Sequence, residues 1–109
     1  MSDERKANLR RAIRNARGPA QCMYVFNGKP WCVIGQLASL EGVTVESLSE
    51  WVGFIELIDD SAAKSLLDRY GTDLLSNLQG IWDDDDETAA TKRFEMRELV
   101  NEAELPALP

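Results

Sequence analysis

The fold is decided by residues 22–34, which are Cys-Met-Tyr-Val-Phe-Asn-Gly-Lys-Pro-Trp-Cys-Val-Ile. Asn27-Gly28 favours a two-residue type I′ turn, because both central positions of that turn need a positive φ. The flanking residues are β-branched or aromatic, so the whole stretch predicts a β-hairpin. Both faces of the hairpin are apolar, and we expect helices to cover at least one of them. A two-residue turn sets the register as Phe26 with Lys29, Val25 with Pro30, Tyr24 with Trp31, Met23 with Cys32 and Cys22 with Val33.

Outward from the hairpin, apolar residues recur at helical spacing, and glycines stand at the ends of several segments. The first helix has an apolar face of Leu9, Ala12, Ile13 and Ala16, and Thr44 and Thr72 are the predicted N-caps of two later helices. For residues 53–58 the pattern fits two structures equally: a continuation of the preceding helix, or an extended segment that crosses the domain. It predicts a loose tail over residues 104–109, because two prolines fall there. The fold class is therefore α+β and mostly helical, with one β-hairpin packed against about five helices in a single domain. The predicted helices cover residues 4–17, 35–41, 44–51, 61–70, 72–82 and 87–103.

The 109 residues suit one domain, and their net charge of −7 is unevenly spread. Residues 1–18 form a basic N-terminal helix and its end, with six bases and two acids, whereas residues 19–109 carry six bases and seventeen acids. The body of the chain therefore repels phosphate, and the N-terminal helix attracts it. The basic helix could equally dock on the acidic body or on a neighbouring copy, which leaves a homo-oligomer open.

The chain has two cysteines and no histidine. In the two-residue register Cys22 and Cys32 point to opposite faces, whereas a three-residue loop would bring them to one face. A cysteine nucleophile would need a base, and two cysteines alone fall short of a structural zinc site. We therefore interpret both as packing residues and predict no catalytic residue, metal or cofactor. The lack of a signal peptide and of a long apolar run favours the cytoplasm and no membrane contact.

The run Asp83, Asp84, Asp85, Asp86 and Glu87 is the strongest local charge signal. A calcium loop is disfavoured, because alanine falls where such a loop needs glycine. A solvated loop before the last helix is the simplest interpretation, since acids suit a helix N-terminus. The alternatives are an acidic docking surface and a mimic of nucleic acid, with carboxylates in place of phosphates.

Three arginines, Arg10, Arg14 and Arg17, continue from Lys6 as a basic stripe along the first helix. The stripe indicates a solvated face, a partner-binding face or, less strongly, a nucleic-acid contact, since no aromatic residue accompanies the arginines. Trp31 lies across from Tyr24 on the hairpin. If their face is exposed, the pair predicts a protein-binding patch, and if a helix covers it, both are core.

The order of the hairpin, Cys32-Val33-Ile34-Gly35 and a helical second half resembles small uncharacterised proteins of actinobacteria and their phages. The segments Gly42 to Glu46, Tyr70-Gly71, Leu74-Leu75 and Leu78 to Asp83 add to the resemblance, which covers about residues 20–85. It implies a phage or mobile-element protein that acts in a bacterial host cytoplasm, and it carries no catalytic residue. We therefore expect a non-enzymatic accessory module that binds a protein of the host. The alternative is a nucleic-acid-linked regulator that binds DNA through the first helix or mimics DNA through the acidic run.

Overall fold

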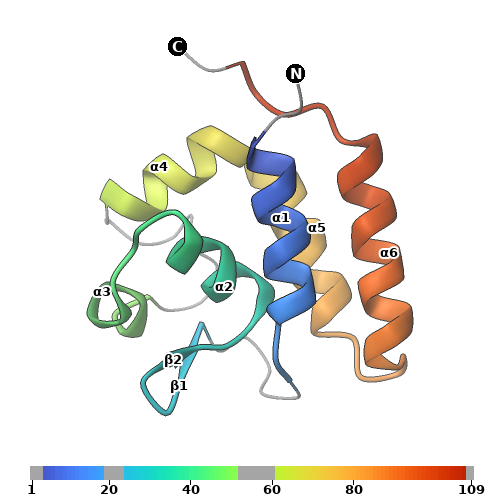
Figure 1. Ribbon diagram of the computed structural model, residues 1–109, viewed down its shortest axis with the longest axis horizontal. Helices are drawn as coiled ribbons and strands as arrows, with labels where there is room; N and C mark the ends of the chain where they lie inside the picture. The colour runs from blue at the N-terminus through green and yellow to red at the C-terminus, as the bar shows by residue number, and fades with distance from the viewer. Residues whose placement is uncertain (1–3, 19–23, 52–60, 108–109) are drawn as a thin grey trace.

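The computed structural model describes residues 4–18, 24–51 and 61–107, and it confirms a mostly helical α+β fold with one hairpin (Figure 1). Helix α1 stands between α2 and α6, and α5 packs against α2, α4 and α6. The described elements are α1 (Glu4–Asn15), β1 (Val25–Phe26), β2 (Lys29–Pro30), α2 (Val33–Leu40), α3 (Val45–Ser49), α4 (Ser61–Tyr70), α5 (Thr72–Trp82) and α6 (Ala89–Glu102).

The hydrophobic core gathers side chains from every helix. The apolar face predicted for the first helix is confirmed, because Leu9, Ala12, Ile13 and Ala16 are all buried. Burial of such side chains from water supplies the main free energy of folding, at roughly 25 cal/mol for each Å² of apolar surface. The other large core side chains come mainly from α2, α4, α5 and α6: Val33, Ile34, Leu37, Leu48, Leu66, Tyr70, Leu75, Leu78, Met96 and Val100.

The hairpin has the predicted register and turn but is shorter than predicted. Asn27 and Gly28 have φ values of 54° and 74°, and the pairs Val25–Pro30 and Phe26–Lys29 are both present. The Trp31 amide donates to the Tyr24 carbonyl at 3.0 Å, so Tyr24 and Trp31 form a hydrogen-bonded pair. Because such pairs alternate along an antiparallel ladder, the next pair, Val25–Pro30, is not hydrogen-bonded, and the missing N–H of Pro30 costs no hydrogen bond.

The prediction of strand through residue 34 was wrong, because α2 begins at Val33, two residues before the predicted start of that helix. Val33 and Ile34 favour strands by propensity, but as helix residues both are completely buried, and burial outweighs propensity here. Gly35 allows α2 to lie directly on the hairpin backbone. Cys32, just before α2, is a buried thiol, which confirms its packing role, whereas Cys22 lies outside the described residues.

Short polar and glycine positions delimit the other helices. Thr44 caps α3 as predicted, since its hydroxyl accepts from the Ser47 amide at 3.2 Å. Gly71, with a φ of 87°, separates α4 from α5 and takes the N-cap position that the sequence assigns to Thr72. Thr88 caps α6, which begins at residue 89. The undecided segment 53–58 lies outside the described residues.

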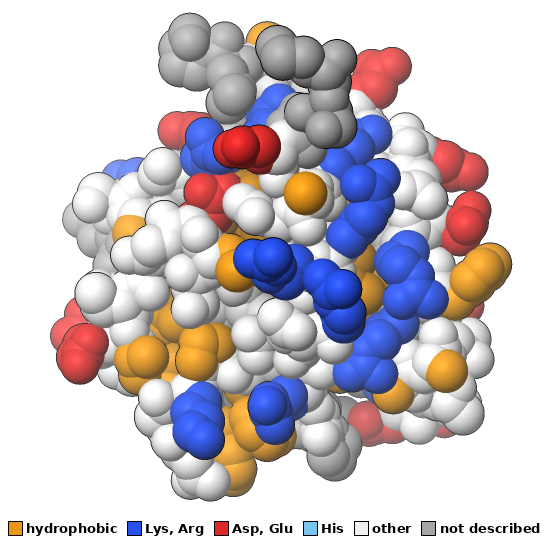
Figure 2. Space-filling view, in the orientation of Figure 1, with side chains coloured by type: hydrophobic (Ala, Val, Ile, Leu, Met, Phe, Trp, Pro, Cys, Tyr) orange, Lys and Arg blue, Asp and Glu red, His pale blue; other side chains and the backbone are white. Residues whose placement is uncertain are grey.

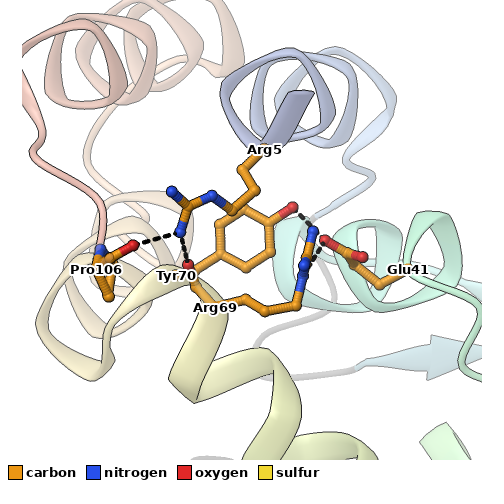
Figure 3. A network of polar contacts seen from close by, with 5 residues as sticks. All are labelled: Arg5, Glu41, Arg69, Tyr70 and Pro106. Atoms are coloured by element: carbon orange, nitrogen blue, oxygen red, sulfur yellow. Dashed lines mark hydrogen bonds and ion pairs between the residues drawn. The ribbon is translucent and has the colours of Figure 1, made fainter. Parts of the chain in front are cut away.

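A buried arginine joins α1 to α4 and to the C-terminal segment (Figure 3). Nη1 of Arg5 donates to the carbonyl of Arg69 at 2.6 Å and to that of Pro106 at 2.8 Å. The segment predicted to be a loose tail is thus held at Pro106, and Leu105 is half-buried against the core. The basic N-terminal helix therefore contributes one of its charges to the interior.

A second polar contact joins α4 to the end of α2 in the same region (Figure 3). The Tyr70 hydroxyl donates to Oε1 of Glu41, and Nε of Arg69 donates to the same oxygen at 3.2 Å. Burial of Tyr70 and its bond to the Glu41 carboxylate raise the pKa of the phenol above its usual range. The phenol therefore stays protonated and keeps donating well above neutral pH.

Candidate functional site

A cleft of about 520 Å³ opens where the end of α1, the exit of the hairpin and the start of α6 meet. It holds two tryptophans, and its wall carries three cations and three carboxylates. The described residues that line it are Ala16, Arg17, Gly18, Trp31, Trp82, Asp83, Asp85, Glu87, Ala89, Lys92 and Arg93.

Trp82, the last residue of α5, is fixed in the wall of the cleft by contacts on several sides. It is 7% exposed, and its Nε1 donates to the carbonyl of Arg17 at 3.0 Å. Cationic groups of Lys92 and Arg93 lie 5.4 and 5.0 Å from the centre of its ring, within the range of cation–π attraction. These contacts hold the indole in one orientation, as a preformed binding surface requires.

Lys92 and Arg93 also donate hydrogen bonds to backbone carbonyls at the C-terminal ends of two other helices. Nζ of Lys92 donates to the Trp82 carbonyl at 2.9 Å, at the end of α5. Arg93 donates to the carbonyls of Ile13 at 3.2 Å and Ala16 at 2.7 Å, at the end of α1. Cations at helix C-termini meet the negative end of the helix dipole and orphan carbonyl groups. The sequence shows both bases one turn inside α6 but does not reveal these distant acceptors.

Trp31 is half-buried at the hairpin side of the cleft. Its ring packs against Phe26 with a centroid distance of 4.8 Å, and Phe26 is 37% exposed, so aromatic surface continues from the cleft toward the hairpin turn. Nε1 of Trp31 is buried and has no hydrogen-bond partner within the described residues. A buried donor without an acceptor costs about 1–3 kcal/mol.

Tyr24 belongs to the core, in contrast to its place in the predicted aromatic patch. It is 4% exposed and meets Trp51 edge to face at 5.7 Å between ring centroids. The cross-strand neighbour Trp31 instead packs on Phe26. Of the two hairpin residues proposed from the sequence, the cleft therefore keeps Trp31 alone.

The acidic run divides between two sides of the loop between α5 and α6. Asp83, Asp85 and Glu87 line the cleft, whereas Asp84 lines a groove between α5 and α6. The Asp84 carboxylate accepts from the amide of Asp86 at 2.9 Å, which is an Asx turn. The structure therefore places three of the five carboxylates in the cleft and the Asp84 carboxylate in a separate groove.

The Glu87 carboxyl of the acidic run has a raised pKa. Desolvation of its carboxyl raises the pKa of Glu87, and the neighbouring carboxyls of Glu95 and Asp84 raise it further. Lys92 acts in the opposite direction. As the pH falls, protonation of Glu87 therefore reduces the negative charge of the cleft wall.

The basic stripe of α1 reaches the cleft only at its end. Arg17 lines the cleft, and Arg14 lines an adjoining hollow. Nη2 of Arg10 donates to Oδ1 of Asn101 at 2.9 Å, near the far end of α6. The structure thus brings Arg17, Trp31 and three of the five acids of the run into one site and leaves Arg10 outside it.

Among the residues that the structure describes, no group of three histidine, cysteine, aspartate or glutamate side chains is arranged to hold a metal ion. Within the same ranges, no helix has both the length and the apolar character to cross a membrane. In comparisons with known proteins, no protein-family model, no curated protein and no solved structure matches this chain.

Proposed function

We propose that this protein is a non-enzymatic binding module that receives a segment of a partner protein in the cleft between Trp31 and Trp82. The observation that carries the proposal is the pairing of two tryptophans with both signs of charge around one open cleft. Tryptophan and arginine are among the residues most enriched in binding hot spots. Mixed charge at the rim suits a peptide segment, which presents both donors and acceptors.

The aromatic surface extends beyond what a small ligand would need. Phe26, packed on Trp31, continues the apolar surface outside the cleft onto the hairpin. This continuous aromatic surface favours a protein surface over a compact metabolite as the occupant.

Binding rather than catalysis is favoured by the chemistry of the side chains. The chain contains no histidine, and Cys32 is 1% exposed, so it offers no accessible thiol. The carboxylates of the cleft share it with Arg17, Lys92 and Arg93. A wall of mixed charge suits the binding of a polar protein segment.

The proposed partner is a bacterial host protein, and the proposed location is the bacterial cytoplasm. Both follow from the resemblance of residues 20–85 to small proteins of actinobacteria and their phages. A partner with basic residues beside an aromatic or aliphatic residue fits the carboxylates next to the two tryptophans.

Quantitative affinity capture from an actinobacterial lysate, followed by binding measurements with the purified partner, tests this proposal. Trp31→Ala and Asp85→Lys alter the cleft, whereas Phe94→Ala and Glu98→Lys change exposed residues of α6 that do not line it. We expect a protein whose affinity falls at least about tenfold with either cleft variant, as for a hot-spot residue. The two control variants should bind it as the unaltered protein does.

Circular dichroism of each variant separates loss of binding from loss of folding. If Trp31→Ala fails to fold, Asp85→Lys still tests the cleft, because Asp85 is exposed. A set of captured proteins that bind all four variants equally would refute the proposal.

A further inference from the structure

A basic band crosses the protein where α1 lies beside α6, outside the proposed binding cleft for most of its length (Figure 2). The two helices run antiparallel, since Lys6 near the start of α1 contacts Asn101 near the end of α6, and Arg93 near the start of α6 contacts Ala16 after the end of α1. We define the basic band as Lys6, Arg10, Arg14 and Arg17 together with Arg93 and Arg97, which precede Asn101 at steps of four residues on α6.

The described hydrogen-bond acceptors of the basic band are neutral groups. Lys6 and Arg10 donate to the carbonyl and the amide oxygen of Asn101, and Arg93 donates to backbone carbonyls. The band therefore makes no ion pair with a carboxylate of the described ranges, in contrast to Arg69, which pairs with Glu41. Like charges on neighbouring helices repel one another, and an anionic partner would relieve that repulsion.

At the end of α1 the basic band borders an open hollow of about 570 Å³. Three guanidinium groups and two side-chain amides line it within the described part of the chain, and no carboxylate does. Guanidinium groups donate paired hydrogen bonds that match the oxygens of a phosphate. The described lining consists of Arg14, Asn15, Ala16, Arg17, Gln36 and Arg93.

The basic band is long enough to contact several charges of a polyanion, which favours a polyanion over a single anion as its ligand. The band runs from Lys6 to Arg17 along and just beyond α1, so it extends over about 16 Å at about 1.5 Å per residue. A DNA duplex presents a phosphate about every 3.4 Å along each strand, which supplies several phosphates over that distance. The band contains no aromatic residue on which unpaired bases could stack.

We infer that the basic band binds the phosphate backbone of a nucleic-acid duplex without reading its sequence, as a second activity separate from the proposed protein-binding cleft. Six cations set an upper limit of about six neutralised phosphates. The acidic remainder of the chain opposes this contact, so we expect micromolar or weaker affinity, within the usual range for non-specific binding.

Fluorescence anisotropy with two labelled DNA duplexes of unrelated sequence, measured over a salt series, tests the inference. We expect equal affinity for both duplexes, with log K falling against log salt with a slope of up to about −5. Each of Arg10→Gln, Arg14→Gln and Arg97→Gln should reduce that slope by about 1. Lys64→Gln removes the same charge from an exposed position of α4 and should leave the slope unchanged.

Several results would overturn the inference. The first is that the protein does not bind either DNA duplex at about 50 mM salt. The second is that Lys64→Gln reduces the salt slope as much as the substitutions in the basic band do. The third is that polyglutamate at equal charge concentration displaces the duplex. The last result would assign the band to an acidic protein. Concentration-dependent self-association that Arg14→Gln abolishes would assign it instead to the acidic run of a second copy. The cleft variant Trp31→Ala should leave DNA binding unchanged, so this inference and the proposed function can fail independently.

Discussion

Replacement of Gly35 by alanine tests the described glycine at which an added Cβ would lie closest to another atom. A Cβ atom at position 35 would lie 2.1 Å from the carbonyl oxygen of Tyr24 and 3.0 Å from its carbonyl carbon. The oxygen must therefore move by about 0.9 Å even to reach 3.0 Å. It cannot move freely, because it accepts the Trp31 amide at 3.0 Å and the Tyr24 ring is buried against Trp51.

The expected loss of stability follows from three contributions. Forcing an extra carbon into this contact costs about 3 kcal/mol, at the upper end for overpacking because the obstacle is backbone. Weakening of the Trp31–Tyr24 hydrogen bond adds about 1 kcal/mol. The better helix propensity of alanine returns about 1 kcal/mol. We therefore expect Gly35→Ala to lower the free energy of unfolding by about 3 kcal/mol, or the midpoint of thermal unfolding by roughly 15 °C.

Gly80→Ala is the matched control, because Gly80 also lies inside a helix but has no atom within 4 Å of the position that an added Cβ would take. It should raise the free energy of unfolding by up to about 1 kcal/mol through helix propensity alone. Urea unfolding followed by circular dichroism measures both variants, with an unchanged m-value as the test of two-state behaviour. A Gly35→Ala protein within about 0.5 kcal/mol of the unaltered chain would refute the proposed contact between α2 and the hairpin.

Two further predictions concern the polar contacts of Figure 3. Arg5→Ala removes two charge-assisted hydrogen bonds and should lower the free energy of unfolding by about 3 kcal/mol. The control Arg11→Ala, at an exposed position of the same helix, should change that free energy by less than about 0.5 kcal/mol. Equal urea midpoints for the two variants would contradict this prediction. Burial and the Glu41 carboxylate raise the pKa of Tyr70, so its contribution to stability is complete below the unfolded-chain value of about 10 and is lost as the pH rises above it. The free energy of unfolding should therefore fall less steeply above about pH 10 in Tyr70→Phe than in the unaltered protein, and parallel curves from urea titrations would show that Tyr70 is not responsible.

The features that the sequence predicts correctly are those with a local cause. The Asn27-Gly28 turn fixes the register through backbone conformation alone. Thr44 caps α3 through a hydroxyl three residues away from its donor. The buried face of α1 follows from spacing within one helix.

The features that the sequence does not predict depend on contacts between distant segments. Val33 and Ile34 have strand propensity, and only their burial under α1 and α5 explains why they are helical. The wall of the cleft depends on the hydrogen bonds from Arg93 to the Ala16 carbonyl and from Lys92 to the Trp82 carbonyl. The sequence of α6 contains no pattern that predicts these distant acceptors. The basic stripe likewise gains Arg97 only through the packing of α6 on α1.

The positions of Lys92 and Arg93 have a consequence for local opening of the protein. Because they are consecutive residues of one helix, detachment of the first turns of α6 would release the last carbonyls of α1 and α5 in a single event. The ends of all three helices should then form one cooperative unit, with amide hydrogen exchange at a shared rate. The proposed cleft lies within that unit, so a partner that binds there would slow exchange in three helices at once.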